Sequence, residues 1–220
     1  RAKEQGALLE GPITVLRQGV GIWNEWRRAN MAFLSLQGAD LSWADLLNAD
    51  LRGVDLSNSD LSGTNLHGVN FEDTNLYRAK LHDAKLSGTH LKNTNLREAD
   101  LRQTDLRGLD LRTVHLQGAG LAKALMPRTI LCGMDLSGID FQGADLSDAD
   151  LRDAVVTGAN FHGANLQRAC LTGLELVGMD FGAADLSGAE LADANLQGAD
   201  LTGANLSGAF AGLPFLMKDL

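Results

Sequence analysis

The sequence contains little of what most globular cores and membrane anchors are made of. Aromatic residues account for 5% of the 220 residues, and there are three prolines and two cysteines. No run of 18 apolar residues occurs, so we expect no helix that crosses a membrane. Few aromatics and 25 glycines would suit a disordered chain, unless the apolar residues follow a pattern that stacking can bury.

Motifs of catalysis and nucleotide binding are missing as well. There is no G-x-S-x-G elbow, no G-x-x-x-x-G-K-[ST] loop and no G-x-G-x-x-G that opens a helix. The five histidines have no second His or Cys at metal-ligand spacing. They are His67, His82, His90, His115 and His162. We therefore expect a protein that is not an enzyme, with no catalytic residue, no metal and no cofactor.

What the sequence does have is a repeat of five residues. From Leu36 to Leu206 every fifth residue is apolar, which makes 35 centres, 29 of them leucine. The others are Phe71, Met126, Phe141, Val156, Phe161 and Phe181. A period of five forms no stripe on an α-helix and alternates between the two faces of a strand. The chain must therefore bend at every repeat, and the unbroken column argues against disorder.

Each position in the repeat has its own preferences. In the repeat 184–188, ADLSG, we name the residues in order the inner, polar, central, outer and corner positions. The inner position is Ala, Ser or Thr in 26 of 35 repeats, and the polar position is Asp or Asn in 23. Glycine occupies 18 of the 35 corner positions, where a turn needs its permissive backbone. Inner and central residues point the same way in an extended segment and should form the core.

Bulky residues indicate how many repeats make one coil. Phe141, Phe161 and Phe181 are spaced by twenty, as are several bulky inner residues. Stacking at this interval predicts four sides per coil. The core should contain these three phenylalanines together with Leu96 and Leu101. Cys132 and Cys170 would then lie about two rungs apart, roughly 10 Å and beyond disulfide reach, and should be free thiols.

At this density the A(D/N)LxG repeat resembles that of the pentapeptide-repeat family, over about residues 34–208. The resemblance implies an all-β fold, a right-handed quadrilateral β-helix with four repeats per coil. With a rung spacing of about 4.8 Å, 35 repeats would give about nine coils and a rod of roughly 42 Å.

The two ends lack the repeat. Residues 1–33 are expected to form an N-terminal cap, because Ile13, Leu16, Val20 and Trp23 follow an amphipathic helix pattern, weakened by two glycines. Trp23 and Trp26 should pack against the first coil, although a partner-binding helix is the alternative. Residues 209–220 are expected to cap the last coil or to form a dimer contact, as in the quinolone-resistance branch of the family, so the protein should be a monomer or a C-terminal homodimer. The apolar residues of this segment are Phe210, Leu213, Phe215, Leu216 and Met217.

One stretch, residues 119–131, departs from the outward pattern while its inward positions persist. We expect a degenerate coil rather than a looped insertion. Pro127 cannot donate a ladder hydrogen bond and should mark the weakest or bulged point. Leu125 and Ile130 beside it form a candidate contact surface, with sequence drift as the alternative.

Charge varies along the repeat region. Residues 131–206 carry 12 acids and two arginines, a net charge of −10, whereas residues 76–115 carry eight basic and five acidic residues, net +3. Four arginines hold the outer position of successive repeats and should ring one coil. They are Arg97, Arg102, Arg107 and Arg112. They either pair with Asp100, Asp105 and Asp110 or grip an acidic partner. The overall net charge of −9 opposes direct binding to nucleic acid.

Two functions follow from these features. The first is a rigid module that binds a protein partner, whose identity the sequence does not reveal. The second is DNA mimicry: the acidic half spreads one net charge per ~1.8 Å, against ~1.7 Å in B-DNA. Resemblance to the quinolone-resistance branch implies binding to a type II topoisomerase such as gyrase. The acids expected to carry it include Asp135, Asp140, Asp145 and Asp150. We expect a cytoplasmic protein; the periplasm or the thylakoid lumen would follow if an upstream signal was removed.

Overall fold

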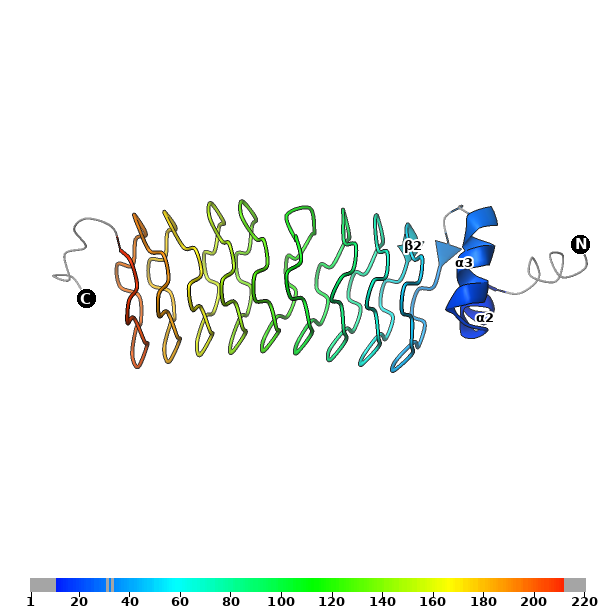
Figure 1. The fold of residues 1–220 in the computed structure, drawn as a ribbon, viewed down its shortest axis with the longest axis horizontal. Coiled ribbons are helices and arrows are strands. Elements are labelled where there is room, and N and C mark those ends of the chain that lie inside the picture. The colour runs from blue at the N-terminus through cyan, green and yellow to red at the C-terminus, as the bar shows by residue number, and fades with distance from the viewer. Residues whose placement is uncertain (1–10, 31, 33, 212–220) are drawn as a thin grey trace, which may run out of the picture.

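The computed structural model describes residues 11–30, 32 and 34–211, and it shows a long rod with two helices at one end (Figure 1). Helix α2 spans Pro12–Arg17 and helix α3 spans Val20–Ala29. Strands β1, Leu34–Ser35, and β2, Val54–Asp55, pair in parallel. From there on, isolated parallel bridges join residues twenty apart, such as Asp60 and Lys80. The predicted coil of four five-residue sides is confirmed, and the fold is a right-handed quadrilateral β-helix.

The four sides are numbered by their central residues, which recur every twenty positions. Side 1 runs from Leu36 to Leu196, side 2 from Leu41 to Leu201, side 3 from Leu46 to Leu206 and side 4 from Leu51 to Leu191. Central and inner residues fill the rod, and Leu96 and Leu101 are fully buried. On side 2 the rings of Phe141, Phe161 and Phe181 stack nearly parallel, with centroids 5.2 and 5.3 Å apart.

Neighbouring coils are joined by three main-chain hydrogen bonds on each regular side. On side 2, the Leu61 N–H donates to the Lys80 carbonyl at 2.7 Å and the Gly63 N–H to the His82 carbonyl at 2.9 Å. The Lys80 N–H donates in return to the Ser59 carbonyl at 2.9 Å. The central, corner and polar residues are thus the donors of the ladder. The N–H of the outer position has no place in it.

The side chain at the polar position accepts a hydrogen bond from the outer residue's N–H, which the ladder does not use. All 23 Asp and Asn residues at this position accept a hydrogen bond from the N–H of the outer residue two places on, as Asp185 does from Ser187 at 2.9 Å. This is the Asx turn, a local bond that short polar side chains form readily. The abundance of carboxylates therefore has a structural cause.

Corners require a left-handed backbone. Of the 35 corner residues, 34 have φ between 54° and 73°, and 18 of these are glycine. The exception is Thr113, whose β-branched side chain disfavours that conformation. The turn at this place is visibly broader than those around it (the green coil in Figure 1).

Pro127 is not the weak point of the rod, so that expectation is wrong. The register continues through residues 119–131, since Leu125 bridges to both Asp105 and Asp145, and the prediction of a degenerate coil is confirmed. Pro127 stands at an outer position, where the missing N–H costs no ladder bond. Its neighbours Met126 and Arg128 donate to the next coil at 2.7 and 2.8 Å. Leu125, at the polar position of this repeat, has no side-chain acceptor for the N–H of the outer residue. Pro127, the outer residue, has no N–H to donate, so no hydrogen bond is lost here.

The ladder is interrupted elsewhere, where the inner residue is large. Between residues 60 and 210, five polar-position N–H groups donate no backbone hydrogen bond to the preceding coil. Each follows an inner Leu, Ile or Met, at positions Leu109, Met134, Ile139, Leu174 and Met179. Inner valines keep the bond, since the N–H of His115, after Val114, donates to the Thr94 carbonyl at 3.0 Å. We attribute the loss to side chains that extend at least one atom further than valine and push their side of the coil away from the preceding coil.

Shortening one such side chain should restore the ladder. In Leu174→Val, we expect the Glu175 N–H to reach the Ala154 carbonyl and to exchange with solvent up to about tenfold more slowly, as one hydrogen bond allows. Hydrogen exchange by NMR measures this. The reciprocal change, Val114→Leu, should release the His115 N–H. Unaltered exchange at both amides would contradict the size rule.

The N-terminal segment forms two helices rather than the single helix that the apolar spacing predicts. The chain breaks at Gly19, with φ of 119°, so that α2 and α3 can lie across the end of the rod (Figure 1). Trp23 is fully buried and Trp26 packs against the core, as predicted. Their rings lie 5.5 Å apart.

Side chains of α3 take the place of a missing coil on side 4. The Trp23 Nε1–H donates to the Asp50 carbonyl at 2.8 Å and Arg27 Nη2 to the Arg52 carbonyl at 2.5 Å. Asn24 Oδ1 accepts from the Asp50 N–H at 2.8 Å. These are the three bonds that a preceding coil would make. The helix thereby closes part of the edge that a solenoid leaves exposed.

Candidate interaction surfaces

Across the part of the chain that the structure describes, no three His, Cys, Asp or Glu side chains are grouped so that they could hold a metal ion. Cys132 and Cys170 are free thiols, as predicted. Within the same described ranges, no helix has the length and apolar character needed to cross a membrane.

The four arginines at outer positions do ring one coil, one on each side, and three of them pair with an aspartate of their own repeat. Arg102, Arg107 and Arg112 each direct Nε and Nη2 at the carboxylate two residues earlier, at 2.6–2.9 Å. These aspartates are Asp100, Asp105 and Asp110. Arg97 has Asn95 at that position and donates instead to Gln117 at 3.0 Å. Most of the positive charge of this coil is therefore neutralised locally.

These pairs shift the ionisation of both partners. The hydrogen bonds from Arg102, Arg107 and Arg112 hold the pKa of Asp100, Asp105 and Asp110 below their ordinary values. A carboxyl whose pKa is lower in the folded state stabilises the fold above its unfolded pKa, about 4. That contribution disappears as the pH falls through the lower, folded-state pKa.

Without Arg102, Arg107 and Arg112, the stability of the protein should depend less on pH in the acidic range. In a variant with glutamine at 102, 107 and 112, we expect Tm to fall less than in the wild type between pH 7 and pH 2, by on the order of a few degrees because the pairs are solvent-exposed. Circular dichroism melts along this pH range measure it.

The matched control replaces Lys85, Lys123 and Arg128 by glutamine. It removes the same charge from cations that make no ion pair with described residues. Equal acid profiles in the two variants would show that net charge, and not the arginine–aspartate pairs, sets the response.

The acids of the C-terminal half surround the rod instead of lining one side. Asp135, Asp140, Asp145 and Asp150 stand on sides 1, 2, 3 and 4 of successive repeats. Asp140 and Asp145 accept from the amides of Asn160 and Asn165 in the next coil at 3.1 and 3.0 Å. Asp150 is paired with Arg152 at 2.7 Å. Asparagines thus separate stacked carboxylates that would otherwise repel one another.

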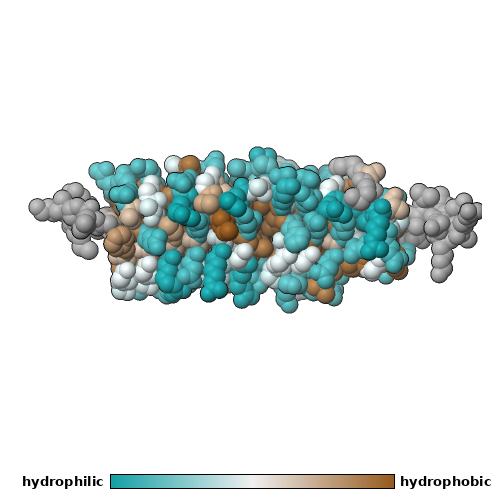
Figure 2. Space-filling view, turned by 45° about the horizontal axis from the view of Figure 1, so that its top comes forward, coloured by the Kyte–Doolittle hydropathy of each residue, from teal (hydrophilic) through white to brown (hydrophobic). Residues whose placement is uncertain are grey.

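The surface proposed around Pro127 is divided between two sides. Leu125, 42% exposed, lies on side 3, and the half-buried Ile130 lies on side 4. Leu125 stands between Asp105 and Asp145, and Ile130 between Asp110 and Asp150. Apolar residues on the face drawn in Figure 2 are likewise separated by hydrophilic ones. The role of these residues in binding stays a prediction.

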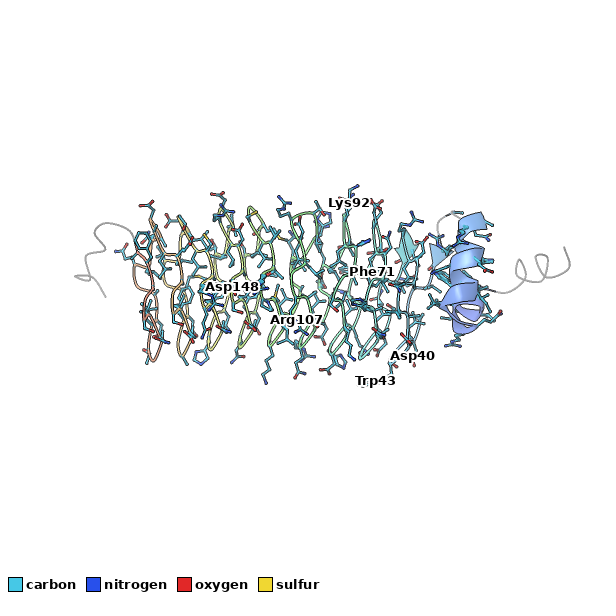
Figure 3. All side chains as sticks on the ribbon, in the orientation of Figure 1. Asp40, Trp43, Phe71, Lys92, Arg107 and Asp148 are labelled. Carbon is cyan, nitrogen blue, oxygen red and sulfur yellow. The ribbon has the colours of Figure 1, made fainter. Side chains whose placement is uncertain are left out.

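Sequence reasoning missed several exposed apolar residues. Trp43 is 75% exposed at the N-terminal end of the rod, where Figure 3 shows it at the outer margin next to Asp40. Leu47 follows one repeat later, and Val155 and Val177 are half exposed on side 1. The signal was available, since Trp43 is the one aromatic residue at a corner position.

Comparison with known proteins identifies the family to which this repeat belongs. The family described as "Pentapeptide repeats (8 copies)" matches residues 27–63, 35–73, 55–93, 74–112, 94–133, 135–173 and 175–210. The chain belongs to the pentapeptide-repeat family. As a pentapeptide-repeat protein it shares the repeat that the sequence predicts, over most of its length. Among curated proteins, none matched it.

Solved structures of the same family are similar to it. HetL, involved in heterocyst differentiation regulation in the cyanobacterium Nostoc sp. strain PCC 7120, is 38% identical over 80% of this chain and 84% of HetL, with a TM-score of 0.42. QnrB1, a plasmid-mediated fluoroquinolone resistance protein, is 18% identical over 82% of this chain and 91% of its own, with a TM-score of 0.44. A thylakoid-lumen protein of Arabidopsis thaliana is 25% identical over 54% and 68%, with a TM-score of 0.26.

Proposed function

We propose that this pentapeptide-repeat protein is a non-enzymatic, rigid module that binds a protein partner. The observation that supports this most is the contrast between its two kinds of position. Inner and central residues are buried along the rod and partly buried at its two ends, while the outer positions carry side chains as different as Ser, Arg, Tyr, Pro and Val. A uniform scaffold with a varied surface suits recognition, as in other solenoids.

Photo-crosslinking in the native cell tests this proposal. Benzoylphenylalanine is placed at exposed apolar positions, Leu47, Leu125 and Val177, and at Ser137 as a polar control. We expect a defined crosslinked product from at least one apolar position and none from Ser137. The absence of a product at every position would contradict the proposal.

A second candidate is nucleic-acid mimicry directed at a type II topoisomerase. The observation that favours it is that acids of the C-terminal half occur on all four sides, as phosphates surround a duplex. They include Asp135 and Glu175 on side 1, Asp140, Asp180 and Asp200 on side 2, Asp145, Asp148 and Asp185 on side 3, and Asp150, Asp153, Glu190 and Asp193 on side 4.

A gyrase supercoiling titration, with and without a fluoroquinolone, tests mimicry. The variant replaces Asp135, Asp140, Asp145 and Asp150 by asparagine, which can still accept the turn bond, as Asn165 does from Gln167 at 3.1 Å. Mimicry predicts inhibition or drug protection that the variant loses. No effect at tens of micromolar protein would remove this candidate and leave the interaction module.

A further inference from the structure

The N-terminal edge of the rod is closed on side 4, whereas the described residues leave it open on sides 2 and 3. In a regular ladder, the polar residue's N–H and C=O and the outer residue's C=O bond to the preceding coil. Side chains of α3 replace that coil only at Asp50 and Arg52. The equivalent groups on sides 2 and 3 make no backbone hydrogen bond with the described residues. They belong to Asp40, Ser42, Asp45 and Leu47, which we name the open edge.

Trp43 stands at the corner between the two halves of the open edge. It has a left-handed backbone, with φ of 59°, a conformation that is strained for a residue other than glycine. Its indole lies over Gly63 of the next coil, where an added Cβ would clash with the ring. Because the residue stays 75% exposed, little burial offsets the strain. Nothing in the packing of the rod requires tryptophan here.

The open edge is also acidic. Asp40 and Asp45 are both exposed, and Asp60 lies beside Asp40 in the next coil. Ser42 donates to Asp40 at 2.7 Å and lowers its pKa, so the carboxylate stays charged at neutral pH. Nearby positive charge comes from Arg17, which acts on Asp40, and from Lys80, which pairs with Asp60 at 3.3 Å. Asp45 has an amide partner, Asn65, and forms no ion pair with the residues that the structure describes.

We propose that the open edge binds an extended, basic segment of a partner polypeptide, which continues the ladder where α3 does not. Two of its N–H groups, two residues apart, would donate to the carbonyls of Asp40 and Ser42, and one of its carbonyls would accept from the Asp40 N–H. This is the main-chain mode of strand addition. A lysine or arginine of the segment would lie across the Trp43 indole and reach the carboxylates. The inference rests on the proposed function, since it locates the partner's binding surface.

The probe is a fluorescent ten-residue peptide of alternating lysine and valine, with binding followed by anisotropy. We expect saturable binding that weakens about tenfold in Trp43→Gly, because the corner tolerates glycine and only the aromatic contact is lost. Asp40→Asn with Asp45→Asn should weaken it by about as much. A peptide N-methylated at alternate residues should not bind, because it lacks ladder donors. On binding, the Asp40 amide should become protected from exchange.

The matched control is Asp185→Asn with Asp200→Asn, which removes the same charge from sides 3 and 2 near the other end. This control should bind like the wild type. Equal weakening in the control, or no saturation below about 1 mM, overturns the inference, because it would show diffuse attraction or none. Two other results would overturn it. Tighter peptide binding after deletion of residues 1–10 would show that the chain's own N-terminal segment occupies the open edge. A dimer that is lost in Trp43→Gly would show that a second copy of the chain occupies it. Crosslinks from Leu125 or Val177 in the cell would leave the proposed function standing in each case.

Discussion

Phe161→Ala should destabilise the rod by about 3–5 kcal/mol, the usual effect of removing a buried phenyl ring from a core that cannot close around the space. Phe161 is fully buried between Phe141 and Phe181, and its ring contacts both. The cavity would therefore remove support from the coil before it and the coil after it. Urea unfolding followed by circular dichroism measures the loss.

The control is Phe161→Leu. Leucine occupies 29 of the 35 central positions, so the fold accepts it there, and we expect a loss of less than about 1.5 kcal/mol. Hydrogen exchange should show the alanine effect concentrated on the neighbouring coils, since each coil contacts only its neighbours. A similar loss in both variants would mean that the stacked rings, and not filled volume, stabilise this part of the rod.

Trp23→Ala should have an effect of similar size at the N-terminal end, about 3–5 kcal/mol. The substitution removes a fully buried indole and the hydrogen bond to the Asp50 carbonyl. With α3 loosened, the edge of side 4 would join the open edge, and the exposed ladder groups would favour association between molecules. Size-exclusion chromatography and thermal melts check the two consequences.

Trp23→Phe separates the two contributions. It keeps most of the buried ring and loses only the donor, so the expected loss is about 1–3 kcal/mol, the effect of leaving one buried carbonyl unpaired. A Trp23→Ala protein that melts like the wild type and stays monomeric would show that α3 contributes little to the end of the rod.

The period of five predicted most of this fold because it is a constraint that few backbones satisfy. Once the central residues were aligned, the stacking of Phe141 on Phe161 and the four sides followed from the twenty-residue spacing of bulky residues. The fate of Pro127 did not, because it depends on which N–H groups the ladder uses, and that becomes visible only when coils are stacked. The two helices at Gly19 depend in the same way on the shape of the surface they cover.

The candidate surfaces were harder to predict than the fold. Sequence spacing placed Arg102, Arg107 and Arg112 in one ring and named their aspartate partners, because both lie within a single repeat. It could not show that Leu125 and Ile130 face different directions without assigning each repeat to a side. The open edge escaped notice because it is defined by main-chain groups, which every residue has and no sequence pattern reports. The expectations for residues 1–10 and 212–220, including the C-terminal cap or dimer contact, lie outside the described residues.

Because of the way α3 closes side 4, the contacts at this end of the rod do not depend on how many coils the rod has. Apart from one hydrogen bond of Arg27 to the Asn30 carbonyl at the end of α3, the side-chain hydrogen bonds of Trp23, Asn24 and Arg27 go to the main chain of residues 48–52, whose atoms would be the same in any coil. A deletion or duplication of twenty residues further along would therefore move the far end by one rung and leave this end unaltered. Each such step also returns every side to its original orientation. The rod can therefore be lengthened by whole coils without a change at its N-terminal end. Any recognition surface near Trp43 would keep its structure, while its distance to the C-terminal end would change.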